Sequence, residues 1–167
     1  MEIRFNFRRD CYLIDLRRVF LFSLLFVGAG MLVCFLSGGA NLYTLLLLPR
    51  FAPRLGICVI VWTLMHILIA TALETLISSC KFRCNNKMKA LLLICTAIIV
   101  GYMWMPLFFG MNAFVFSLAV SVLCAFITFL ALKTLVRLCP LSALLIGIYL
   151  IYLVYCALFT FCVMILN

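Results

Sequence analysis

Five long apolar runs, separated by short polar or charged segments, dominate the pattern of hydrophobic and polar positions along the chain. Each run is close to the ~20 residues that an α-helix needs to cross ~30 Å of hydrocarbon. The runs cover residues 19–37, 55–77, 88–105, 112–132 and 141–165. They predict an all-α membrane protein, a bundle of five transmembrane helices. Residues 1–18 form a basic lead-in, and residues 19–167 form a single membrane domain.

Composition excludes a soluble protein. The chain is 69% hydrophobic with a mean hydropathy of +1.38, whereas soluble domains are about 45–50% apolar. Most of the ten cysteines lie inside apolar runs, where cysteine behaves as a small hydrophobe. Cys80 and Cys84 flank a basic loop, but they lack the CxxC spacing and a nearby histidine. We therefore expect no metal site.

The basic residues are distributed unevenly about the runs. With five spans, residues 1–18, 78–89 and 133–140 share one side of the membrane, and these segments hold eleven of the thirteen Lys and Arg residues. The positive-inside rule then places the N-terminus in the cytoplasm. Residues 1–18 are read either as an amphipathic lead-in lying on the membrane surface or, as we favour, as an orientation signal alone. The net charge of +9 thus reports topology, and no nucleic-acid partner is expected.

A proline-rich segment precedes the second run. Pro49 and Pro53 lie four residues apart, with Phe51 between them and Arg50 and Arg54 after each proline. Proline has a fixed φ and no amide hydrogen, so it suits the mouth of a span and the first turn of a helix. We expect a rigid, kinked loop that covers the outer end of the bundle.

Two segments resemble the TspO/MBR family, the tryptophan-rich sensory proteins of bacteria and the mitochondrial translocator protein. The first resembles the family's Trp-Tyr, Pro-x-Trp-x-Pro-Pro and Trp pattern at Tyr43, Pro49, Phe51, Pro53 and Trp62. The second is the run from Trp104 to Gly110, Trp-Met-Pro-Leu-Phe-Phe-Gly, which is similar to the family's Trp-x-Pro-x-Phe-Phe-Gly. Tyr149-Leu150-x-Tyr152 and the closing Leu166-Asn167 add weaker likeness.

This chain departs from the family pattern at several positions. Among the differing residues are Arg54, Ile60, Gly101, Tyr152 and Thr160, which stand where the family has Pro, Pro, Asn, Trp and Asn. The chain therefore resembles a tryptophan-poor member, and these changes put the family's ligand preference in doubt.

The resemblance implies an internal pocket for porphyrin-type tetrapyrroles or similar planar hydrophobic ligands. It requires no cofactor, although porphyrin or haem is a candidate ligand. The residues expected at this site are Tyr43, Pro53, Trp62, His66, Trp104, Phe108, Tyr152 and Cys156. The resemblance also implies a multi-pass protein of a bacterial cell membrane, surrounded by lipid, and a homodimer contact on the third helix. Ala97 and Gly101 form a small-xxx-small pair suited to that contact or to packing within one chain.

Two residues with ring side chains on the second run are candidate ligand contacts. Trp62 lies about 10 Å of helix rise from the outer end, where indole would stack on a flat ligand; the alternative is an interfacial belt residue. His66, the sole histidine, lies one turn deeper on the same face. It would contact a tetrapyrrole or its metal, or it would bond a nearby backbone carbonyl or Thr hydroxyl as a neutral imidazole. Both readings of His66 remain open.

Two other functions remain alternatives. The resemblance includes family members that degrade porphyrins in light, which would make this an enzyme. No hydrolytic constellation is present, however, and no catalytic residue is predicted. Glu74 is the only acidic residue inside a run, which would suit a proton-coupled exporter. We favour a carboxylate that reaches the basic loop, close to Lys81 and Arg83.

Overall fold

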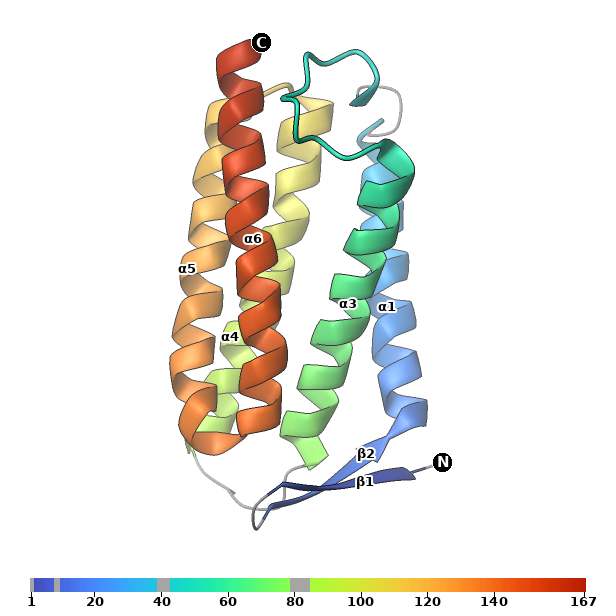
Figure 1. Cartoon of the computed structure of the whole chain (residues 1–167), viewed down its shortest axis with the longest axis vertical. Helices are drawn as coiled ribbons and strands as arrows, with labels where there is room; N and C mark the ends of the chain where they lie inside the picture. Colours follow the sequence, from blue (N-terminus) through green and yellow to red (C-terminus); the bar gives the residue numbers. More distant parts are fainter. Residues whose placement is uncertain (1, 8–9, 39–42, 79–84) are drawn as a thin grey trace.

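The computed structural model describes residues 2–7, 10–38, 43–78 and 85–167 of the chain. It contains five helices that are long and apolar enough to cross a membrane (Figure 1). They are α1 (Leu16–Leu36), α3 (Leu55–Ser78), α4 (Asn85–Met105), α5 (Phe114–Leu138) and α6 (Pro140–Leu166). The prediction of an all-α membrane protein built as a five-helix bundle is confirmed.

The helices form a ring that is packed more tightly on one side than on the other. In Figure 1, α4, α5 and α6 stand together, whereas α3 and α1 form a second group beside them. The main core lies between α3, α4, α5 and α6 and includes Ile69, Ile94, Leu135 and Ile146, each 2% exposed or less. On α1, Gly30 is the only buried residue. Helix α1 is therefore the outermost element, and it packs mainly against α3.

The connection between the last two helices differs from the prediction. A loop was expected over 133–140, but α5 continues to Leu138, and Cys139 alone separates it from α6. Nothing in 133–138 breaks a helix, and Lys133 extends its ammonium to 4.9 Å from the centre of the Phe129 ring. Pro140 then begins α6, where its missing N–H costs no hydrogen bond, and it holds the preceding Cys139 in an extended conformation.

The junction between α4 and α5 is a π-helical turn. It spans Pro106–Gly110 and is closed by a bond from the Met111 N–H to the Pro106 carbonyl oxygen at 3.0 Å. Asn112 follows with φ of 52°, a left-handed conformation that asparagine tolerates better than most residues. This turn makes α4 and α5 antiparallel neighbours, as the sequence predicted, although α5 begins two residues later than expected.

The N-terminal segment forms a β-hairpin. Strand β1 (Glu2–Phe7) pairs antiparallel with β2 (Asp10–Asp15), and the hairpin lies below the lower ends of α1 and α3 in Figure 1. The side chain of Asp15 accepts a bond from the Arg17 N–H and so caps α1. Helix α1 therefore begins at Leu16, three residues before the predicted start. The lead-in therefore contains regular structure, and its role as an orientation signal stays a prediction.

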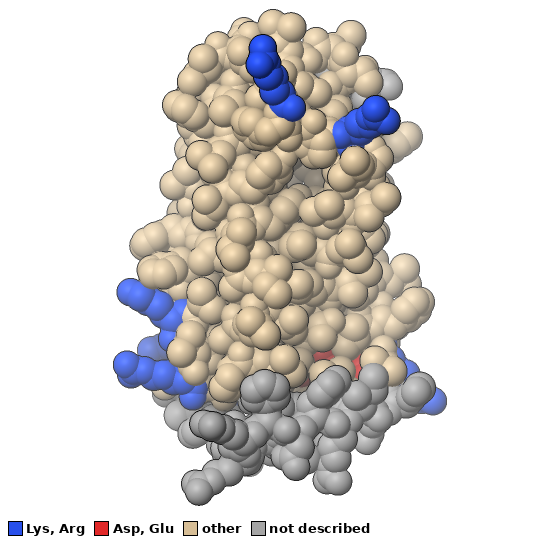
Figure 2. All heavy atoms as spheres, in the orientation of Figure 1, with Lys and Arg blue, Asp and Glu red and all other residues tan. Residues whose placement is uncertain are grey.

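Charged side chains gather at the two ends of the molecule. Figure 2 shows basic residues at both ends and an uncharged belt between them on the face drawn. Arg50 and Arg54 belong to the end that carries the C-terminus. The other end carries the described basic residues Arg17, Arg18, Lys87, Lys89, Lys133 and Arg137. An uncharged belt flanked by charges is the arrangement that a bilayer requires.

Candidate functional site

A large cavity occupies the half of the bundle nearer the C-terminus. Its volume is about 820 Å³, within the ~300–1,000 Å³ typical of small-molecule sites. All five helices contribute: Met31, Cys34 and Phe35 come from the last turns of α1, and Trp62 and His66 come from the first half of α3. The loop over residues 43–54, hereafter the strap, adds Tyr43 and Pro53.

The structure brings most of the predicted site residues together. Seven of the eight line the cavity: Tyr43, Pro53, Trp62, His66, Trp104, Tyr152 and Cys156. The exception is Phe108, which is completely buried and lies behind Trp104 with the ring centres 4.6 Å apart. Phe108 therefore supports the wall and cannot touch a ligand. That the other seven bind a ligand stays a prediction.

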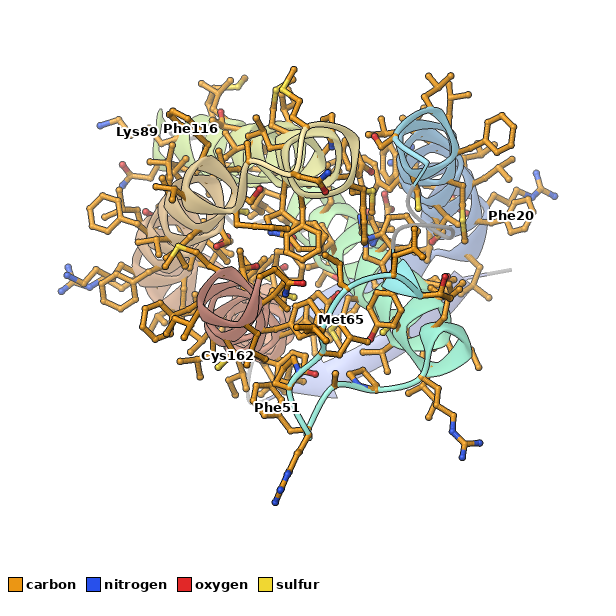
Figure 3. The ribbon with its side chains drawn as sticks, turned by 90° about the horizontal axis from the view of Figure 1, so that it is seen from above. Phe20, Phe51, Met65, Lys89, Phe116 and Cys162 are labelled. Carbon is orange, nitrogen blue, oxygen red and sulfur yellow. The ribbon has the colours of Figure 1, made fainter. Side chains whose placement is uncertain are left out.

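The strap is bound to α3 and α6. The Tyr43 hydroxyl donates to the Pro53 carbonyl at 2.5 Å, and the Cys58 thiol donates to the Tyr43 oxygen at 3.4 Å. Burial raises the pKa of Tyr43, so the phenol keeps its proton at neutral pH and continues to donate. Tyr43 also stacks on Phe159, with the ring centres 6.4 Å apart. In Figure 3, which looks down on the strap, Phe51 lies beside α6.

Asn167 binds the part of the strap around Leu47. Its side-chain oxygen accepts from the Leu47 N–H at 3.0 Å, and its amide nitrogen donates to the Leu47 carbonyl at 3.1 Å. This pair of bonds satisfies both backbone groups of Leu47, much as a neighbouring strand would. Asn167 therefore holds the middle of the strap against the end of α6.

Removing this amide should loosen the strap. We expect Asn167→Ala to speed tryptic cleavage after Arg50, an exposed strap residue, roughly tenfold, because the two lost bonds are worth about 0.5–1.5 kcal/mol each. The rate would be measured on purified protein in detergent by mass spectrometry. Asn86→Ala, an exposed change at the opposite end of the bundle, is the control. Equal cleavage rates for the two variants would show that the bonds between Asn167 and Leu47 do not hold the strap in place.

Three rings are stacked at the α1 side of the cavity. The ring centres of Trp62 and His66 are 4.0 Å apart, and those of His66 and Tyr102 are 5.8 Å apart with nearly parallel planes. The Tyr102 hydroxyl donates to the Phe26 carbonyl of α1 at 2.7 Å. A β-carbon on Gly30 would lie 2.3 Å from the Trp62 ring. Trp62 is therefore wedged against the backbone of α1 and is fixed on the cavity wall.

His66 bonds a backbone carbonyl, which was one of its two expected roles. Nδ1 lies 2.8 Å from the Trp62 carbonyl oxygen, and because a carbonyl can only accept, Nδ1 carries the proton. The ring also lines the cavity. The local bond fixes the tautomer and leaves Nε2 without a proton, so the imidazole presents an acceptor.

Trp104 is held by α6. Its Nε1–H donates to the Thr160 hydroxyl at 3.0 Å, and that hydroxyl donates in turn to the Cys156 carbonyl. The ring lines the cavity while its N–H is already satisfied. Trp104 can therefore offer a ligand the face of its ring but no hydrogen bond.

The structure adds cavity residues that sequence reasoning missed. They are chiefly Tyr102, Cys124, Tyr149, Tyr155 and Phe159. Two of them, Tyr149 and Phe159, recur with the predicted Tyr152 and Cys156 at intervals of three or four residues on α6, which places all four along one helix face. That spacing was readable from the sequence and could have identified them.

The pair Ala97 and Gly101 faces the interior of the bundle. Ala97 is 3% exposed, and its carbonyl accepts from the Cys124 thiol of α5 at 3.2 Å. Gly101 lines the cavity, and a β-carbon there would lie 3.6 Å from the Cys124 sulfur. These small residues let α4 approach α5 within one chain, which agrees with the alternative of packing within one chain. The homodimer stays untested.

Glu74 lies at the far end of α3, outside the cavity. Its side chain is fully buried, accepts a bond from the Ser78 hydroxyl and lies 3.8 Å from Arg18 of α1. The expected extension toward the basic loop stays a prediction, because Lys81 and Arg83 lie outside the described residues. Arg18 also lies 3.6 Å from Asp15, so the ion pair ties α3 to the end of the hairpin.

The comparison with protein families gives a single clear result. The model of the TspO/MBR family matches residues 20–166, which is nearly all of the chain. No curated protein matches the chain significantly. The matched range includes four helices, all but the first four residues of α1, and every residue of the cavity wall. The chain belongs to the TspO/MBR family.

Proposed function

We propose that this protein is an integral membrane receptor or sensor that binds porphyrin-type tetrapyrroles or similar planar hydrophobic ligands in the cavity beneath the strap. Family membership and the apolar five-helix bundle fit a membrane sensor or transporter. The observation that supports the binding of planar hydrophobic ligands is the cavity of about 820 Å³, whose wall carries aromatic side chains from the strap, α3, α4 and α6. Such a chamber suits a flat apolar molecule.

The orientation follows from charge. The end that carries the hairpin holds six of the eight described basic residues outside that hairpin's strands, and the positive-inside rule assigns such an end to the cytoplasm. The strap would then face outward, and a bacterial cell membrane is the proposed location. A reporter fused to the C-terminus, active only outside the cytoplasm, would test this arrangement.

Trp62 is the residue with which we test the site. Trp62→Phe keeps an aromatic ring but reduces the π surface, and we expect the affinity for protoporphyrin IX to fall about threefold to tenfold, from aromatic contacts worth about 0.5–1.5 kcal/mol. Affinity would be measured from the absorbance shift of the porphyrin on binding. Phe20→Leu on the outer face of α1, 67% exposed, is the control. An unchanged affinity for Trp62→Phe would remove this residue from the site.

A light-dependent porphyrin-degrading enzyme is the second candidate. What favours it is that both tryptophans of the chain line the cavity, because indole rings beside a photoexcited porphyrin are oxidisable. Illumination of the protein with protoporphyrin, followed by its absorption spectrum, separates the two functions: bleaching well above that of a protein-free control indicates degradation. A proton-coupled exporter using Glu74 is less favoured, since Glu74 does not line the cavity.

A further inference from the structure

Two groups of basic side chains lie at the end of the molecule that carries the hairpin, and they differ in how their charge is balanced. Beside α1 and α3, Arg18 lies 3.6 Å from Asp15 and 3.8 Å from Glu74. The second group, hereafter the α4–α5 cluster, consists of the exposed residues Lys89, Lys133 and Arg137. No carboxylate among the described side chains lies within ion-pair distance of this cluster. Its charges are therefore open to an anion from outside the chain.

The three cations of the cluster lie close together in depth although they come from two helices. The Cys124 thiol of α5 donates to the Ala97 carbonyl of α4, which relates the positions along these two antiparallel helices. Counted from that contact, Lys89 on α4 lies about 12 Å and Lys133 on α5 about 13.5 Å toward the hairpin end, and Arg137 lies one turn beyond Lys133. Figure 2 shows basic side chains gathered at this end on the side of α5, and in Figure 3 Lys89 points away from the bundle. The cluster thus presents its charge at one corner of the molecule.

Each helix of the cluster also carries an exposed apolar side chain one turn nearer the middle of the membrane. On α4, Leu92 follows Lys89 by three residues and is 60% exposed, and on α5, Phe129 precedes Lys133 by four and is 41% exposed. Residues at these spacings share a helix face. The Lys133 ammonium lies over the Phe129 ring, 4.9 Å from its centre, so this charge is turned toward the hydrocarbon. An anion that reaches it there is expected to carry an apolar part.

The helix ends favour the same sign of charge. Helices α4 and α6 both begin at this end of the bundle, and neither has an acidic residue in its first turn. The free N–H groups and the macrodipole at the N-terminus of a helix attract anions. Together with the exposed cations, these helix ends produce a positive field beside the membrane surface.

We propose that the α4–α5 cluster binds an anionic phospholipid of the leaflet at the hairpin end. The lipid phosphate lies between the three cations, and an acyl chain follows Leu92 and Phe129. Basic pockets between transmembrane helices are known to bind such headgroups. A free phosphate would use the cations alone, whereas a lipid uses the cations and the apolar side chains together. The site lies outside the cavity and does not depend on the ligand proposed for it.

The test measures the affinity of the full chain in detergent for dioleoylphosphatidylglycerol and for dioleoylphosphatidylcholine by native mass spectrometry. We expect the anionic lipid to bind about tenfold more tightly or better. The triple variant Lys89→Gln, Lys133→Gln and Arg137→Gln should weaken the anionic lipid on the order of a hundredfold, about fivefold for each charge near the surface. The zwitterionic lipid should bind this variant and the original protein equally.

A second triple variant with the same net charge is the matched control. Arg17→Gln, Arg50→Gln and Arg54→Gln remove three exposed cations elsewhere and should leave the affinity for the anionic lipid unchanged. Equal losses in the two triple variants would overturn the proposal, because net charge rather than this corner would then attract the lipid.

Two further measurements identify the source of the phosphate. Phe129→Ala should weaken the anionic lipid severalfold, whereas Phe116→Ala, an exposed change near the other end of α5, should not. Inorganic phosphate at millimolar concentration should not displace the lipid. If it does, the cluster binds a free anion and the lipid site is overturned. Since no porphyrin enters these measurements, their failure would leave the proposed function standing.

Discussion

Gly30→Ala should destabilise the bundle on the order of 3 kcal/mol, the upper part of the range for overpacking a filled interior. The new β-carbon would lie 2.3 and 2.4 Å from two atoms of the Trp62 ring and 3.0 Å from Tyr102. Trp62 cannot retreat without losing its stack on His66, 4.0 Å away between ring centres. We therefore expect α1 to move outward or the indole to swing into the cavity. Thermal unfolding in detergent would measure the loss.

The chain provides a matched control two residues away. Gly28 lies on the same helix, and a β-carbon there would meet nothing within 4 Å. Alanine is the better helix former by about 1 kcal/mol, so Gly28→Ala should leave stability unchanged or raise it. Ligand affinity should fall for Gly30→Ala alone. If both variants unfold at the same temperature as the original protein, the close approach of Trp62 to α1 is wrong.

Phe108→Ala should have a comparably large effect on stability without touching the ligand directly. The Phe108 ring is 0% exposed and lies within 4.6–6.0 Å, between ring centres, of Trp104, Phe109, Phe114 and Phe159. Deleting such a ring costs about 3–5 kcal/mol in soluble cores. A value near the lower end is expected here, since lipid is as apolar as the interior and only packing is lost.

Phe116→Ala tests whether that loss comes from burial. Phe116 is on α5, 68% exposed, and points away from the bundle in Figure 3. Its truncation should change the unfolding temperature little. Phe108→Ala should also release Trp104 from its stack and so shift the emission of that indole. Equal stability of the two alanine variants would show that the aromatic cluster around Phe108 does not support the cavity wall.

The length of each apolar run was sufficient to predict the five helices. Hydrocarbon thickness fixes the number of residues in a span, so a run such as 55–77 could be assigned without knowing its neighbours. The observed helix Leu55–Ser78 ends one residue later. The proline loop was also predictable, because Pro49 and Pro53 restrict the backbone locally.

Features that depend on distant partners could not be predicted in the same way. The end of α5 was misplaced by six residues because Lys133 was taken as a boundary, although its long side chain can rest on Phe129 while the helix continues. The ion pair of Glu74 with Arg18 was missed because Arg18 lies 56 positions earlier in the chain and approaches only after α1 packs on α3. Phe108 was predicted near the lining residues, but its burial behind Trp104 depends on how the π-helical turn packs, which the sequence does not reveal.

The single residue between α5 and α6 limits how far the two spans can move apart. Leu138 ends one span and Pro140 begins the next, so these two ends stay in contact at one face of the membrane whatever the opposite ends do. Lengthening the link at Cys139 with flexible residues would remove that tether.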